Sequence, residues 1–151
     1  MKEFTHLLYD FILKEGGSET LAVYVNMLAL LLIGLVVVFG IDRLAKVVLV
    51  KLFSKFAERS KTNFDDLLVK NKAPRNIGHI FPLLVALELT PYVFVDFQRL
   101  ERIAEKSIEV FGIILALWIT RSLLNTLKSY FKTLPKLKDK PIDSFIQVFM
   151  I

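Results

Sequence analysis

LAVYVNMLALLLIGLVVVFGI, residues Leu21–Ile41, is a run of 21 residues without a charged side chain. As an α-helix rising about 1.5 Å per residue, the run matches the ~30 Å hydrocarbon core of a bilayer. A helix of a small soluble bundle is seldom apolar on every side over such a length. A secretory signal peptide has a basic segment before its apolar stretch, whereas acidic Glu15 and Glu19 precede this one. We therefore expect this segment to span a membrane.

The composition of the whole chain agrees with a membrane protein. Of the 151 residues, 54% are hydrophobic, and 13 Phe, 4 Tyr and 1 Trp exclude a disordered chain. The absence of cysteine excludes disulfides and thiolate metal sites. The two histidines, His6 and His79, lie far apart without accompanying ligands, so zinc spacings are missing as well. No catalytic constellation is visible, and we expect neither enzymatic activity nor a cofactor or metal.

Two later segments are further candidates for membrane-spanning helices. Residues Ile77–Val95 are mostly apolar but contain Pro82 and Pro91. Because a proline inside a helix removes a hydrogen bond and pushes on the preceding turn, we expect a kink at Pro82. We expect Pro91 to end this helix, with Thr90 in extended geometry. The segment Ser107–Leu127 is long enough for a third span, and its uncharged centre separates charged residues on either side.

Basic residues are distributed unevenly between the candidate spans. Nine lie between the first and second spans and six from the third span onward, whereas two precede the first and three separate the second from the third. Three crossings would place the two larger groups on one side of the membrane, which the positive-inside rule makes cytoplasmic. We therefore expect a multi-pass protein of the cell (inner) membrane with its N-terminus outside and its C-terminus in the cytoplasm.

The predicted fold class is an all-α membrane protein, with an N-terminal interfacial helix followed by three transmembrane helices. Phe4, Leu7, Leu8 and Phe11 recur at helical spacing, which is typical of a helix lying on a membrane surface or on a protein partner. The predicted segments are an amphipathic helix (1–17), a first transmembrane helix with a basic cytoplasmic extension (18–60), a cytoplasmic hairpin (61–76), a second, Pro-kinked transmembrane segment (77–97), a third transmembrane helix (98–134) and a final segment (135–151).

Five basic residues lie in the extension of the first transmembrane helix. They are Arg43, Lys46, Lys51, Lys55 and Arg59. They are candidates for contact with anionic lipid, worth about 1 kcal/mol for each charge near the surface. The alternative is that they only set topology and face water. We expect no nucleic acid partner, because the chain lacks a recognition module.

The predicted hairpin begins with residues suited to capping a helix. Thr62 and Asp65 form a pattern similar to a capping box, and Asp65 and Asp66 are placed where a helix N-terminus favours negative charge. Adjacent carboxylates also occur in acid–base and metal sites. Here no third ligand accompanies them, so we interpret all three residues as hairpin caps.

Two features within the spans are candidates for packing or function. Gly112, Ala116 and Thr120 recur every four residues, which predicts close packing against a neighbouring helix, with a hinge as the alternative. Glu88 is a weak candidate for a proton-relay carboxylate, as acidic residues inside membranes often are. Its position near Pro91 favours an interfacial acid instead.

The stretch RSKTNFDDLLVKNKAPRNIGHIFPLL, Arg59–Leu84, resembles the loop and hairpin of MscS-type mechanosensitive channels of the larger, miniconductance-like subfamily. Asn76 departs from a position where that subfamily has a basic residue. KPIDSFIQVFMI, Lys140–Ile151, is similar to the segment leading into that family's pore helix, with Phe145 in place of Tyr. The residues that carry the first match are Thr62, Asp65, Asp66, Arg75, His79 and Pro82.

The resemblance implies the N-terminal membrane portion of such a channel, with residues 135–151 as a linker and the start of a truncated pore-helix region. It implies lipid-facing helices that sense membrane tension under osmotic stress, membrane lipids as partners, and a homo-oligomer that is a heptamer in full-length channels. On this interpretation the chain lacks the pore helix and the cytoplasmic vestibule. The alternatives are a fragment of a proton-coupled transporter using Glu88, or a small non-channel membrane subunit.

Overall fold

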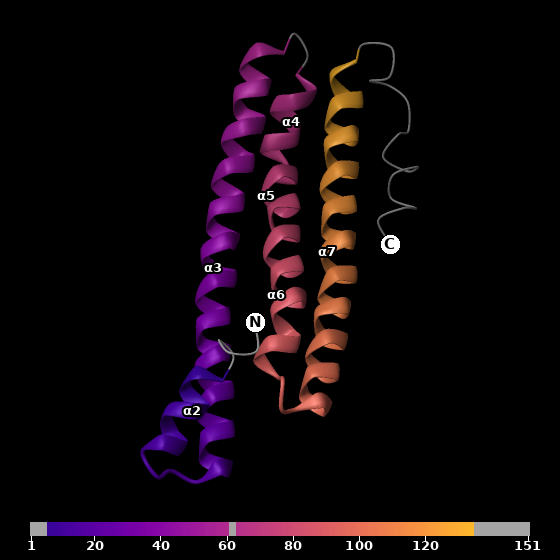
Figure 1. Cartoon of the computed structure of the whole chain (residues 1–151). Coiled ribbons are helices and arrows are strands. Elements are labelled where there is room, and N and C mark those ends of the chain that lie inside the picture. Colours follow the sequence, from indigo (N-terminus) through magenta and orange to yellow (C-terminus); the bar gives the residue numbers. More distant parts are fainter. Residues whose placement is uncertain (1–5, 61–62, 135–151) are drawn as a thin grey trace. The chain divides into compact units, whose positions relative to one another are not determined.

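The computed structural model describes residues 6–60 and 63–134, which form helices and connecting turns without a β-strand (Figure 1). The all-α prediction is confirmed for this part of the chain. The helices form two compact units. Among the described residues, unit 1 combines 6–41 with 81–111, and unit 2 combines 42–60 and 63–80 with 112–134.

Helix α2 (Leu7–Lys14) is followed by a turn that starts the next helix. Gly16 has a φ of +83°, a left-handed conformation that glycine adopts at little cost after the end of a helix. The hydroxyl of Ser18 accepts a hydrogen bond from the Leu21 N–H at 3.3 Å. Ser18 therefore caps the helix that begins at Glu19.

Helix α3 (Glu19–Arg59) is one continuous helix of 41 residues, which contains both the first apolar run and the basic stretch that follows it. Only 11% of its most apolar 18-residue window is buried inside the chain. Leu32, Val36 and Phe39 are 64%, 72% and 68% exposed. The core helix of a soluble protein would bury most of such a window, because burial of apolar surface drives folding in water.

Helix α7 (Gln98–Thr133) has the same character as α3. It has 36 residues, and 11% of its most apolar window is buried. Phe111, Ile113 and Leu117 are among its exposed side chains. By length and composition, α3 and α7 are the two described helices that are able to cross a membrane.

In unit 1, α6 (Ile80–Val93) packs against the apolar half of α3. A Cβ placed on Gly34 of α3 would lie 3.7 Å from the side chain of Val93, which is ordinary van der Waals contact. Further along, the ring centroids of Tyr24 and Phe97 are 5.2 Å apart. Val93 contacts position 34 of α3, and Phe97, later in the chain, contacts the earlier position 24. The two segments are therefore antiparallel.

The prolines of α6 occupy positions that differ from the prediction. The helical path is interrupted at His79, and Pro82 lies in the first turn of α6, where its missing N–H is not needed. Pro91 does not end the helix, which continues for two further residues. Thr90 is helical rather than extended, and its hydroxyl donates to the Ala86 carbonyl at 2.8 Å. A proline in the last turn removes only one hydrogen bond, so the helix tolerates it.

In unit 2, two short helices lie between the second half of α3 and the C-terminal half of α7 (Figure 1). They are α4 (Phe64–Lys70) and α5 (Ala73–Gly78). Lys72 joins them with a left-handed φ of +62°, and Pro74 occupies the first turn of α5, where its missing N–H is not needed. The predicted hairpin is therefore a pair of short helices. Residues 135–151 lie outside the described part of the chain.

Candidate lipid-facing surface and polar contacts

The five basic residues predicted to contact lipid lie in the part of α3 that belongs to unit 2. Arg43, Lys51, Lys55 and Arg59 have exposed side chains. Lys46 is half-buried, and its ammonium lies 2.5 Å from the carboxylate of Asp42, one turn earlier. Four of the five cations therefore face the surroundings of the chain, and the fifth is neutralised within it.

The exposed side of this half of α3 changes in character along the helix. Residues three or four apart lie on one side of an α-helix. Leu44 and Val48 are followed at this spacing by Lys51, Lys55 and Arg59, and all five are exposed. The stripe formed by these five residues is therefore apolar first and basic afterwards, as expected for a helix that passes from hydrocarbon into the head-group region. Leu52 and Phe56 lie beside its basic part and are exposed as well.

A polar cluster connects α3 to the break between α5 and α6. Asp42 Oδ1 lies 2.8 Å from His79 Nδ1 and has no other hydrogen-bonding partner among the described residues. The two atoms form a hydrogen bond only when Nδ1 carries a proton. Asp42 Oδ2 accepts from Lys46. Asp42 is the first charged residue after the apolar run, and the i, i+4 spacing to Lys46 was a signal that the sequence reasoning did not use.

The backbones of α3 and α5 approach closely beside this cluster. A Cβ placed on Gly78 would lie 3.3 Å from the N, Cα and Cγ atoms of Lys46. This distance is shorter than ordinary van der Waals contact, and two of the three atoms belong to the backbone. A side chain at position 78 would therefore require α3 and α5 to move apart by a few tenths of an ångström.

Hydroxyl groups of α7 hold the α4–α5 segment on its other side. The Ser122 hydroxyl donates to the carbonyl of Asn71, and the Thr126 hydroxyl lies 3.5 Å from the carbonyl of Leu67 and 2.9 Å from that of Ser122. Ser122 and Thr126 are both buried. The ring of Phe64 meets that of Tyr130 edge-on with centroids 5.3 Å apart. These contacts were not predicted, since their partners are more than 50 residues apart in the sequence.

The small residues predicted to form a packing surface lie largely outside these contacts. Ala116 and Thr120 are exposed, Gly112 is half-buried, and the Thr120 hydroxyl donates to the Ala116 carbonyl in its own helix at 2.9 Å. Leu115, by contrast, is buried. Packing against another helix at Ala116 and Thr120 stays a prediction.

The predicted capping residues are placed only in part. Thr62 lies outside the described residues. Asp65 and Asp66 occupy the first turn of α4, where the helix dipole favours their negative charge. The residue preceding α4 is Asn63, which makes no side-chain capping bond.

The predicted proton-site candidate, Glu88, is exposed on α6 and forms no ion pair with another described residue. Residues 6–60 and 63–134 contain no group of three or more His, Asp or Glu side chains that could hold a metal ion. The polar groups that the structure brings together are therefore contacts between helices.

Comparison with family models, curated proteins and solved structures gives no match.

Proposed function

We propose that the chain is the lipid-facing, tension-sensing membrane domain of a mechanosensitive ion channel of the MscS type. The channel would be an inner-membrane homo-oligomer, with the pore formed by residues other than those described here. The resemblance at Arg59–Leu84 and Lys140–Ile151 supports the channel family. The observation that carries the membrane location is the exposure of the apolar windows of α3 and α7, each only 11% buried within the chain.

Three crossings are part of the proposal, with the segment from Ala73 to Val93 as the second. This segment is helical except at His79. Separate contacts with α3 lie near its two ends, that of Gly78 with Lys46 and that of Phe97, four residues after the segment, with Tyr24. On α3, Tyr24 and Lys46 are separated by about 33 Å of helix, which is close to the ~30 Å thickness of the hydrocarbon core.

The proposed sidedness places unit 2 toward the cytoplasm. The described residues of unit 2 carry eleven Lys and Arg against four Asp and Glu. Basic residues are retained on the cytoplasmic side during insertion. The N-terminus then lies outside, and the C-terminal end of α7 lies inside.

The sensing mechanism follows from the exposed stripe of α3. Thinning of the bilayer under tension changes which residues of a helix match the hydrocarbon, at a cost of fractions of a kcal/mol per Å of mismatch. The apolar-to-basic change after Val48 fixes the level of α3 in the membrane. Because Asp42 holds His79 and Gly78 abuts Lys46, a change in the tilt of α3 would move the α5–α6 break as well.

The proposal predicts the behaviour of a full-length channel that carries this chain. Replacement of Lys51, Lys55 and Arg59 by glutamine weakens contact with anionic lipid by about 1 kcal/mol per charge at most. We expect the triple variant to open at a different membrane tension with unchanged single-channel conductance. Patch recordings measure both quantities. Gly112→Leu, which forces helices apart at the predicted packing surface, should likewise change the opening tension and leave the conductance unchanged.

A variant with unchanged threshold but altered conductance would place these residues in the ion path and contradict the sensor proposal. Arg75→Gln provides the charge control, because Arg75 is an exposed cation of α5 outside the stripe. Its threshold should remain close to that of the unmodified channel.

A further inference from the structure

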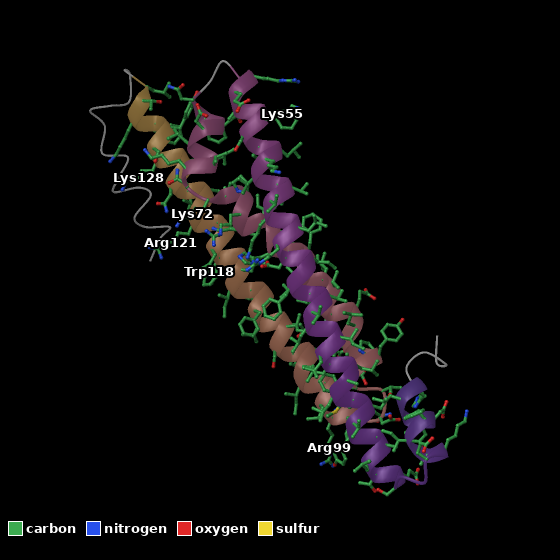
Figure 2. The ribbon with its side chains drawn as sticks, turned by 90° about the vertical axis from the view of Figure 1, so that its left-hand side faces the viewer. Lys55, Lys72, Arg99, Trp118, Arg121 and Lys128 are labelled. Atoms are coloured by element: carbon green, nitrogen blue, oxygen red, sulfur yellow. The ribbon has the colours of Figure 1, made fainter. Side chains whose placement is uncertain are left out.

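A polar pocket of about 170 Å³ lies in unit 2 between the α4–α5 segment and α7. Lys72 and Asn76 line it from the α4–α5 side, and Trp118, Arg121 and Asn125 line it from α7. Figure 2 shows Lys72, Trp118 and Arg121 along the same side of the molecule. Residues from two separate segments therefore converge on one pocket.

The pocket combines two cations with neutral hydrogen-bond donors. Lys72 and Arg121 are exposed, and neither forms an ion pair with another described residue. The amides of Asn76 and Asn125 and the indole N–H of Trp118 are further donors. No described acidic residue lines the pocket. This set of groups favours an anion with several acceptor oxygens, and arginine is well suited to phosphate.

The two walls of the pocket are fixed to each other. Ser122 of α7 donates to the carbonyl of Asn71, and the Asn71 amide donates to the Leu67 carbonyl at 2.9 Å. The next residue, Lys72, has a φ of +62°, which glycine or asparagine adopts more readily than lysine. The backbone conformation therefore does not itself favour lysine at this position.

The pocket lies where the apolar surface of α7 ends. Residues 110–120 are uncharged, and Arg121 is the first charged residue after them. Trp118 is 58% exposed, and tryptophan is enriched at the level of lipid head groups. If α7 crosses a membrane, the pocket is at head-group level.

We propose that this pocket binds the phosphate of an anionic phospholipid head group, with Lys72 and Arg121 as its two cationic contacts. The site is distinct from the basic stripe of α3. The inference rests on the membrane location in the proposed function, and it adds a specific lipid site on α7 and the α4–α5 segment. Trp118 would lie beside the bound head group.

The single tryptophan of the chain makes the site directly measurable, because all indole fluorescence comes from Trp118. The purified full chain in neutral detergent micelles is titrated with phosphatidylglycerol, with phosphatidylcholine or with inorganic phosphate. We expect a saturable change in emission with phosphatidylglycerol alone. Lys72→Gln and Arg121→Gln should each raise the midpoint about fivefold.

Arg75→Gln is the matched control, since it removes an exposed cation three residues from Lys72 that does not line the pocket. Its midpoint should be unchanged. Lys72→Gly is a second test, because it relieves the left-handed backbone while removing the charge. It should raise the midpoint about fivefold, as Lys72→Gln does, while the chain remains at least as stable as before.

Equal midpoints for the two lipids, or equal losses in Arg75→Gln and Arg121→Gln, would overturn the head-group site. Saturation by inorganic phosphate without a response to phosphatidylglycerol would assign the pocket to a free anion and overturn the lipid source. A chain that stays in the micelles but does not distinguish phosphatidylglycerol from phosphatidylcholine contradicts the head-group site and leaves the membrane location in place. A chain that stays soluble without detergent contradicts the membrane location in the proposed function.

Discussion

Replacing Leu32 by arginine should lower the equilibrium constant for insertion of α3 into a membrane more than a hundredfold. Leu32 is near the centre of the uncharged run and 64% exposed. An arginine at the centre of a transmembrane helix costs about 3 kcal/mol relative to leucine. At an exposed position of a soluble protein, the same change would fall within about 0.5 kcal/mol. The size of the effect therefore separates lipid from water as the surroundings of α3.

The fraction of chains that expose position 18 on the outer side measures this insertion. The chain has no cysteine, so Ser18→Cys supplies a single reporter for an impermeant thiol reagent. Leu52→Arg is the control, because Leu52 is 46% exposed in the basic extension, where arginine should be tolerated. Equal labelling in the Leu32→Arg and unmodified chains would contradict a lipid-embedded α3.

Gly78→Leu should destabilise unit 2 by about 1–3 kcal/mol, the usual cost of forcing a larger side chain into a packed site. Even the first added carbon would lie 3.3 Å from the Lys46 backbone, so α3 and α5 must separate. Separation would also disturb the contact between Asp42 and His79. Trp118 is in unit 2, and its fluorescence during titration with a denaturing detergent reports the loss in free energy of unfolding.

Gly40→Leu is the matched control for this substitution. A Cβ on Gly40 would meet no described atom within 4 Å, so a leucine there has room. Its unfolding midpoint should stay close to that of the unmodified chain. Similar losses at positions 40 and 78 would show that the proximity of α3 and α5 is not the cause.

The long helices could be predicted from sequence because their signals are local. The uncharged run Leu21–Ile41 predicts the apolar half of α3, and the apolar residues at helical spacing near the N-terminus predict α2. Each signal lies within a few residues of the feature it specifies. The prediction that Pro91 ends the helix was wrong. A local rule for helix ends does not consider that a proline in the last turn removes only its own hydrogen bond, and α6 ends two residues later.

The polar contacts could not be predicted in this way. His79 is 37 residues from Asp42, and Ser122 is 51 residues from Asn71, so neither pairing has a local spacing. The prediction of a packing surface selected small residues every four positions on α7, whereas the contacts with α4 use Ser122 and Thr126. A helical repeat identifies a face, but the identity of its partner depends on the tertiary arrangement.

In the proposed topology the chain crosses the membrane three times, with residues 73–93 as the second crossing. Single cysteines at Ser18, Asn63 and Gln98 test it most directly in intact cells, with an impermeant thiol reagent applied from outside. We predict that positions 18 and 98 are labelled and that position 63 is labelled only after the cells are opened. Labelling of position 98 only after opening would place it with position 63, remove the second crossing and contradict the account.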